Sequence, residues 1–235
     1  MPSTPRRSFI GALAAAAAAV SLPSRASRVF AAQMDGGHEA WLSDVKGGHK
    51  CLFDFPGHNM GFGLVHIFNY VSTYSAAYGA GAGQVGTVGT FYGMGPGSSI
   101  AMGFNDAMWV KYGISEYLGL EDAHGAAYTR NVFNRPTAAD SHILEAVIKS
   151  PTLPLFQELF VACGIENLQK LGTKFIMCNN ALGGWAAELD VRGKGDAAAI
   201  DADLRANLLP GVTIVPAMVI AIEKAQEAGF AYNRQ

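Results

Sequence analysis

Residues 171–178 read Leu-Gly-Thr-Lys-Phe-Ile-Met-Cys, and they join a predicted helix to a predicted strand. Before them, apolar residues between positions 153 and 171 recur at helical spacing, and Gly172 is typical of the residue that ends a helix. Residues 174–178 then form a short apolar run, which indicates a strand buried on both faces. A helix followed directly by such a strand is typical of an α/β fold with a parallel sheet.

The same alternation extends in both directions from this stretch. Further short apolar runs predict strands at residues 50–55, 85–92 and 212–215, with a short edge strand at 231–232. Helical patterns separate them at residues 62–78, 104–118, 142–148, 196–208 and 217–228. This order predicts a three-layer α/β/α fold with a mostly parallel sheet of about five strands.

Length and composition narrow the class of protein. The chain has 235 residues, of which 50% are hydrophobic and 15% are charged, and its formal net charge is -2. These values exclude a largely disordered chain and a basic nucleic-acid-binding protein, so we expect no nucleic-acid partner. The length suffices for one sizeable domain, and three cysteines are too few for a dense disulfide framework.

The first 32 residues differ from the rest of the chain, because they hold four arginines and no acidic residue. Arg6-Arg7 stands shortly before Phe9 and an alanine-rich run, a pattern that resembles the twin-arginine signal of bacterial export. A membrane anchor is the alternative, but the apolar core is shorter than the roughly 20 residues that span a bilayer. We expect residues 1–32 to be a cleaved export signal, and the protein to be periplasmic with no membrane attachment after cleavage.

The remaining chain divides into two parts. Residues 33–48 are polar and rich in glycine, which predicts a flexible arm. Residues 49–235 are expected to form one domain, since we find no internal repeat and no second core. Within this domain, residues 119–150 have weak periodicity and are expected to be an insertion.

Five stretches resemble the DsrE/DsrF-like family, namely residues 93–96, 105–112, 168–182, 208–217 and 225–232. The resemblance implies a small parallel-sheet α/β/α fold that assembles as trimers or hexamers. It also implies a cysteine that carries sulfur as a persulfide, which by position is Cys178, and a partner protein that donates or accepts sulfur. The following residues, Asn179-Asn180, differ from the Arg-Gly found after the cysteine in the sulfur carriers.

Ligands of open parallel sheets bind beyond the carboxyl ends of the strands. Three segments are expected to meet there, residues 54–59, 93–99 and 178–180. Cys178 is predicted to be exposed and reactive, with His58 as the imidazole that assists it, and the alternative is a buried core cysteine. The candidate ligand-binding residues are Asp54, Asn59, Gly95, Ser98, Asn179 and Asn180.

The other two cysteines and the glycine-rich loop have competing interpretations. Cys51 and Cys163 are expected in the core, although a Cys51–Cys178 disulfide between neighbouring strands stays open. Residues 93–99 form either a loop that binds an anion through its backbone amides or a tight turn.

The histidines do not identify a cofactor. His58, His66 and Asp54 are an alternative set of metal ligands, but their spacing matches no recognisable metal motif. We expect His66 to lie in the core or at a subunit interface. The cofactor therefore stays unknown.

Three functions remain open from the sequence. The first is a DsrE-like protein in which Cys178, assisted by His58, handles sulfur or another thiol-reactive group. The second is a non-catalytic oligomer that holds a small ligand or metal near His58, Gly95 and Asn179. The third is a purely structural oligomer.

Overall fold

Five short strands form one sheet in the computed structural model, which describes residues 37–149 and 154–235. Neighbouring strands are parallel throughout, in the order β4-β3-β2-β1-β5. The strands are β1 (His49–Asp54), β2 (Val85–Phe91), β3 (Lys174–Cys178), β4 (Val212–Val215) and β5 (Ala231–Arg234). Helices flank this sheet, and the predicted three-layer α/β/α fold is confirmed.

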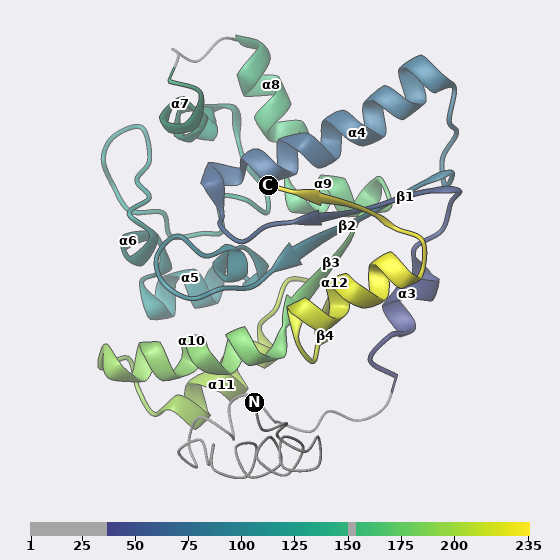
Figure 1. Cartoon of the computed structure of the whole chain (residues 1–235). Coiled ribbons are helices and arrows are strands. Elements are labelled where there is room, and N and C mark those ends of the chain that lie inside the picture. The colour runs from purple at the N-terminus through teal and green to yellow at the C-terminus, as the bar shows by residue number, and fades with distance from the viewer. Residues whose placement is uncertain (1–36, 150–153) are drawn as a thin grey trace, which may run out of the picture. The chain divides into compact units, whose positions relative to one another are not determined.

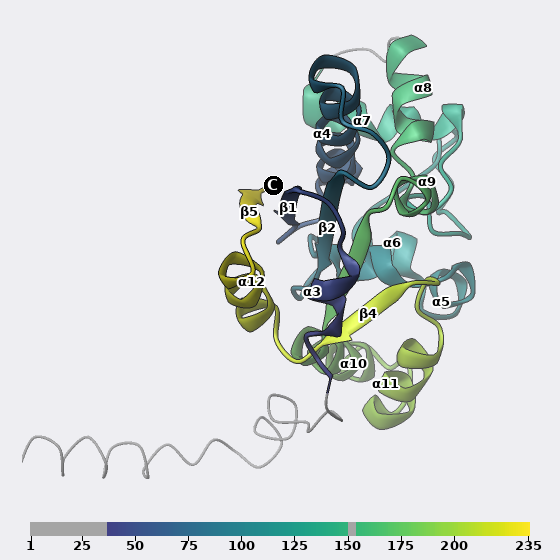
Figure 2. The same ribbon diagram turned by 90° about the vertical axis from the view of Figure 1, so that its right-hand side faces the viewer.

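Helices connect the strands and cover both faces of the sheet (Figure 1). The view in Figure 2 shows α12 on one side of the sheet and α4 on the other. The α-helices are α3 (Ala40–Asp44), α4 (Phe62–Tyr78), α5 (Asp106–Tyr112), α6 (Ile114–Leu118), α7 (His142–Ile148), α8 (Pro154–Ala162), α9 (Ile165–Lys170), α10 (Asn179–Val191), α11 (Ala197–Ala206) and α12 (Met218–Glu227). Three 3-10 turns are η1 (Asn59–Gly61), η2 (Ser99–Gly103) and η3 (Ala138–Ser141).

Two apolar clusters lie on opposite faces of the sheet, because successive side chains of a strand point to opposite sides. The first cluster lies on the α4 face and includes Phe53 and Phe175. The second cluster lies on the α12 face and includes Leu52, Ile176 and Met218. Since both faces are covered, the strands are apolar without alternation, which is why they appear in the sequence as continuous apolar runs.

Two predicted helices are each broken in the structure. The predicted helix 104–118 divides into α5 and α6 at Gly113, whose left-handed φ of 62° ends the first of them. The predicted helix 153–171 divides into α8 and α9 at Gly164, and residue 153 lies outside the described residues. A Cβ at Gly164 would lie 2.6 Å from Pro136 Cδ, so the chain turns there against residues that are distant in sequence.

Part of the predicted flexible arm is ordered. α3 falls within residues 33–48, and its Trp41 is buried with its ring centroid 6.2 Å from that of Phe230. Residues 119–149 also pack against the rest of the domain, since Asn131 donates hydrogen bonds to the carbonyls of Met102 (2.8 Å) and Phe104 (2.7 Å). Residues 40–44 of the predicted flexible arm therefore form a helix that packs against the domain.

Two predictions concern membranes and export. Among the described residues, no helix has the length and apolar character needed to cross a bilayer. The export signal predicted at residues 1–32 lies outside the described residues.

Candidate functional site

The carboxyl ends of the strands bring polar side chains onto the α12 face of the sheet. Side chains two positions apart along a strand point to the same side, as do paired residues of parallel strands. Asp54 on β1 lies two positions after Leu52 of the second cluster, and it pairs with Arg234 on β5. By the same alternation, Thr90 on β2 and Cys178 on β3 also point to the α12 face.

Cys178 ends β3 and is the N-cap residue of α10. Its sulfur accepts hydrogen bonds from the amides of Ala181 and Met218, each with a distance of 3.4 Å. Ala181 belongs to the first turn of α10, and Met218 is the first residue of α12, so the starts of two helices meet at this sulfur. The predicted exposure of Cys178 is wrong, because its side chain is only 6% exposed and packs within the second cluster.

The other two cysteines are buried thiols, as predicted. Burial raises the pKa of Cys51 to about 11 and that of Cys163 to about 12. The Cys51 sulfur donates to the Leu52 carbonyl at 3.9 Å, which requires the protonated form. All three cysteines are free, and Cys51 lies in the first cluster whereas Cys178 lies in the second, so the Cys51–Cys178 disulfide is absent.

Asp54 is a buried carboxylate at the centre of a tyrosine cluster. It accepts hydrogen bonds from the Tyr232 hydroxyl at 2.7 Å and from the Thr90 hydroxyl at 3.4 Å. Burial and then the hydrogen bond to Asp54 raise the pKa of Tyr92, and the bond to Asp54 and burial raise the pKa of Tyr232. Both tyrosines therefore remain protonated donors at neutral pH.

The sequence did not single out Tyr92 and Tyr232 as site residues. Tyr92 directly follows β2 and packs against the second cluster. Tyr232 lies opposite Leu52 in the β1–β5 pair. The position of Tyr92 at the carboxyl end of the predicted strand 85–92 was an available signal, whereas the pairing of β5 with β1 brings together residues 178 positions apart.

His58 is buried, and its ring is bonded within its own loop. Its Nδ1 accepts from the Met60 amide at 3.1 Å, and the ring also hydrogen-bonds to the backbone of Pro96. Burial lowers the pKa of His58, against the opposing effect of the Pro96 bond, so the ring is neutral at pH 7. The ring lies 5.8 Å from Phe133 of the first cluster, on the face opposite Cys178, so the predicted Cys178–His58 pair is wrong.

The loop 93–99 is built as a turn that connects two strand ends. Ser98 is buried, and its hydroxyl donates to the Gly95 carbonyl at 2.8 Å. Ser99 is fully buried, and its hydroxyl donates to the Phe55 carbonyl at 2.5 Å. The Gly95 amide donates to the Glu188 carboxylate at 3.3 Å, so the protein's own anion occupies the amide that was predicted to bind one.

The three asparagines of the predicted site differ in their surroundings. Asn59 is exposed and has a left-handed φ of 39°. Asn180 is half-buried at the start of α10. Asn179 is 2% exposed, and its Oδ1 has no hydrogen-bond partner. Since buried polar atoms are usually bonded, Asn179 retains capacity for a further donor.

The alternative metal ligands do not come together. His66 is exposed, contrary to the expectation of a core or interface position, and its Nδ1 contacts Gln235 Oε1. His58 bonds to Met60 and Pro96, while Asp54 bonds to Tyr232 and Thr90. Across residues 37–149 and 154–235, no group of three or more His, Cys, Asp or Glu side chains could hold a metal ion.

The carboxyl edge therefore contains one cysteine with unusual backbone contacts, one tyrosine-bound carboxylate and one unpartnered amide oxygen. Comparisons of the chain with protein-family models, with curated proteins and with solved structures found no match.

Proposed function

We propose that this is an exported DsrE-like protein that carries sulfur, as a persulfide, on Cys178. The observation that carries the proposal is the pair of backbone amides that donate to the Cys178 sulfur. The sequence resemblance in residues 168–182 assigns sulfur carriage to the same cysteine. Export follows from the signal predicted at residues 1–32.

The hydrogen bonds of the cysteines support a difference in chemistry between them. A thiol can both accept and donate, as Cys51 donates to the Leu52 carbonyl, whereas a thiolate or persulfide anion only accepts. Cys178 accepts from two amides at the positive ends of α10 and α12, and helix N-termini stabilise anions. Two amide donors thus point at the sulfur atom to which the resemblance assigns the persulfide.

The proposed step is a transfer of one sulfur atom without net oxidation. The Cys178 thiolate attacks the outer sulfur of a donor persulfide, R–S–SH. A sulfur–sulfur bond forms to Cys178 while the one in the donor breaks, and the donor leaves as the thiolate R–S⁻. The proton of the donor persulfide stays on the new Cys178 persulfide, so no oxidant is needed.

The other two cysteines serve as internal controls for this proposal, because all three cysteines are similarly buried. The side chains of Cys51, Cys163 and Cys178 are 3%, 2% and 6% exposed, so access to solvent is similar for all three. Native protein would be treated with iodoacetamide, and the modification rate of each cysteine followed by peptide mass mapping. We expect Cys178 to react at least about tenfold faster than the other two. Equal rates would remove the basis for the proposal.

Sulfur loading is measured separately. After incubation of the native protein with a small-molecule persulfide donor, intact-mass analysis should show the mass of one added sulfur atom. The variant Cys178→Ser should lose this addition, whereas Cys163→Ser should keep it. A donor that loads Cys178→Ser equally well contradicts the proposal.

The role of the amides is tested by Met218→Pro. Proline has no N–H but is tolerated at the first position of a helix, and the extended conformation of Ala217 (φ −149°, ψ 137°) suits a residue before proline. The matched control is Met218→Ala, which also removes the buried side chain but keeps the amide. We expect Met218→Pro to react about two- to tenfold more slowly at Cys178 than Met218→Ala.

A second candidate function is a binding module, which the unpartnered Oδ1 of buried Asn179 favours. A bound molecule that donates a hydrogen bond to this oxygen would be detected as added mass by native mass spectrometry of protein purified from the periplasm. Asn179→Leu should release the molecule, and Asn180→Ala should retain it. An unliganded mass for the wild-type protein contradicts this second function.

A further inference from the structure

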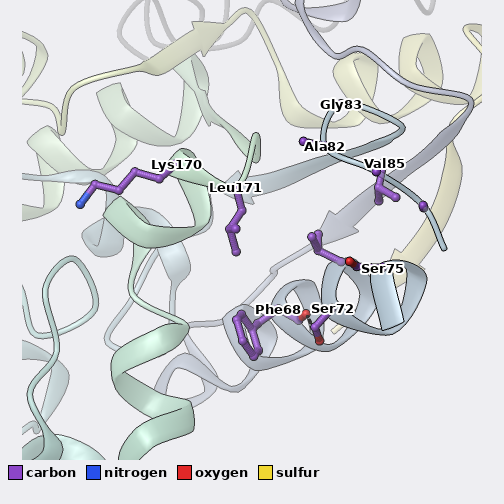
Figure 3. A pocket seen from close by; sticks show the side chains of 11 residues that line it. Phe68, Ser72, Ser75, Ala82, Gly83, Val85, Lys170 and Leu171 are labelled. Carbon is purple, nitrogen blue, oxygen red and sulfur yellow. Dashed lines mark hydrogen bonds between the residues drawn. The ribbon is translucent and has the colours of Figure 1, made fainter. Parts of the chain in front are cut away.

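A cavity of about 350 Å³ lies at the opposite end of the sheet from Cys178. It lies between α4, the glycine-rich loop that leads into β2, and the end of α9, and it is open to solvent on one side, where Ser75 and Ala82 are exposed. Figure 3 shows Phe68, Ser72 and Ser75 on α4 across from Leu171, with Ala82, Gly83 and Val85 at one side. The cavity is therefore at the amino ends of β2 and β3, and it is independent of the function proposed for Cys178.

The body of the cavity is apolar. Phe68 and Val71 line it from α4, and Val85 lines it from the start of β2. Leu171 is 46% exposed although it is a large apolar residue, and in Figure 3 its side chain extends toward the space above Phe68. An apolar ligand would remove this surface from water, which is the main favourable term of such binding.

Hydrogen-bond donors without protein partners border the cavity. The loop 81–84 is a turn in which the Gln84 amide donates to the Gly81 carbonyl, and the amides of Ala82 and Gly83 have no acceptor among the described residues. The Ser75 hydroxyl is likewise unbonded within the described part of the chain, whereas Ser72 donates to the Phe68 carbonyl at 2.8 Å. The Ser75 hydroxyl and these two amides lie on exposed residues, and each can donate to a carbonyl oxygen of a ligand in place of water.

The cavity offers no uncompensated charge. Lys170 is the one charged residue of its lining, and its Nζ forms an ion pair with Glu166 at 2.9 Å. Its side chain runs away from Phe68 and Ser72 in Figure 3. A ligand with a formal charge would therefore be desolvated in an apolar space without a counter-ion, which is unfavourable.

We infer that this cavity binds a small uncharged molecule that is mostly apolar and carries a carbonyl group, such as an aromatic ketone. Its volume lies at the lower end of the range for small-molecule sites. The apolar body packs between Phe68, Val71 and Leu171. The carbonyl oxygen accepts from Ser75 or from the amides of the 81–84 loop.

The probe for this inference is prodan, an uncharged naphthyl ketone whose emission shifts to the blue in apolar surroundings. Titration of the native full-length chain should show saturable binding of one probe per chain, with a blue shift. The anionic probe anilinonaphthalene sulfonate should bind at least about tenfold more weakly, because it brings a charge into the cavity. Tighter binding of the anionic probe contradicts the inference.

Neighbouring residues of α4 provide a matched pair of variants. Ser75→Trp places a large ring in the cavity, whereas Ala76→Trp places the same ring on an exposed position that does not line it. We expect Ser75→Trp to weaken prodan binding at least about tenfold and Ala76→Trp to leave it unchanged. Equal affinities for the two variants place the probe elsewhere and overturn the inference.

A third substitution tests the donor. Ala82→Pro removes an amide that makes no hydrogen bond within the described residues. It should weaken the binding of prodan about two- to tenfold, with little change in the free energy of unfolding. A stoichiometry of one probe per two chains would instead indicate an interface between copies of the chain, and it would equally overturn the small-molecule assignment.

Discussion

The polar groups at the two ends of the sheet differ in their hydrogen bonding. At the carboxyl end, buried groups bond to one another, as Thr90 does to Asp54 and Ser99 does to the Phe55 carbonyl. At the amino end, the Ser75 hydroxyl and the nearby loop amides have no described partner beside a cavity of about 350 Å³. These bonded groups hold the chain together at the carboxyl end, where Asn179 Oδ1 is an exception, whereas the groups beside the cavity at the amino end remain available.

This contrast separates stability from binding. Removing one member of a buried, bonded pair leaves the other unsatisfied, which costs more than the bond itself contributes. Removing an unbonded group beside a cavity costs the fold little but removes a contact for a ligand. Substitutions at the carboxyl end should therefore affect unfolding, and those at the amino end should affect binding.

The largest effect on stability is expected for Asp54→Ala. The substitution removes the buried acceptor shared by the hydroxyls of exposed Tyr232, half-buried Tyr92 and buried Thr90, so the free energy of unfolding should fall by about 2–4 kcal/mol. Urea denaturation measures this loss. Asp54→Asn keeps an acceptor oxygen, so its free energy of unfolding should fall by less than half as much. A fall below about 0.5 kcal/mol for Asp54→Ala would show that Asp54 and its tyrosines are not a structural unit.

A smaller loss is expected for Ser99→Ala. Its hydroxyl donates to the Phe55 carbonyl at 2.5 Å and accepts from the Tyr92 amide at 3.0 Å, so both lose a partner in a fully buried site. We expect the free energy of unfolding, measured by urea denaturation, to fall by about 1–3 kcal/mol. Ser75→Ala at the amino end is the comparison, since its hydroxyl has no partner among the described residues, and the expected change in the free energy of unfolding is within about 0.5 kcal/mol. Similar losses for the two serines would contradict the contrast.

The pH dependence of stability should include His58. Burial lowers its pKa in the folded protein, so the unfolded chain binds more protons once the pH falls toward the ordinary value of 6.5. The contribution of the neutral ring is complete above that value and is lost as the pH falls below it, with a slope of at most about 1.4 kcal/mol per pH unit. Thermal unfolding between about pH 7.5 and 5 measures it.

The variants His58→Gln and His124→Gln separate this effect from general acid destabilisation. His58→Gln should flatten the pH profile, although it lowers stability at neutral pH. His124 is exposed, so its substitution should leave the profile unchanged. A profile that is identical in wild type and His58→Gln would show that His58 does not titrate differently on folding.

The smallest effect is expected for Lys170→Ala at the amino end. The Lys170–Glu166 ion pair is largely exposed, and such pairs contribute little. The free energy of unfolding should change by less than about 0.5 kcal/mol, and prodan affinity should be unaffected because the side chain runs away from the cavity. Loss of prodan binding in this variant would show that charge contributes to the site after all.

Sequence patterns predicted the helices and strands better than the breaks within the helices. The strand at residues 174–178 and the helix at 62–78 were recovered with the bounds that the structure has, since each carries a strong local pattern. The breaks at Gly113 and Gly164 were missed, because an isolated glycine in a helical pattern does not tell whether the chain continues. α10, which begins directly after Cys178, was not assigned.

The candidate site was only partly predictable. That the ends of β1, β2 and β3 meet at one edge follows from parallel strands and was expected. Which face each side chain takes depends on alternation along the strand, and this places Asp54 and Cys178 on the α12 face while His58 lies against Phe133. The pairing of His58 with Cys178 failed for that reason.

The sequence by itself determined the class of the fold, because strands covered on both faces must be apolar throughout and helices between them must carry one apolar stripe. It also determined that Cys51 and Cys163 are buried, since each lies within an apolar run. Only the tertiary structure decided which amides meet the Cys178 sulfur, which tyrosines surround Asp54, and where a cavity remains open. These contacts join residues up to 178 positions apart, and local patterns carry no information about distances between segments that meet only when the chain folds.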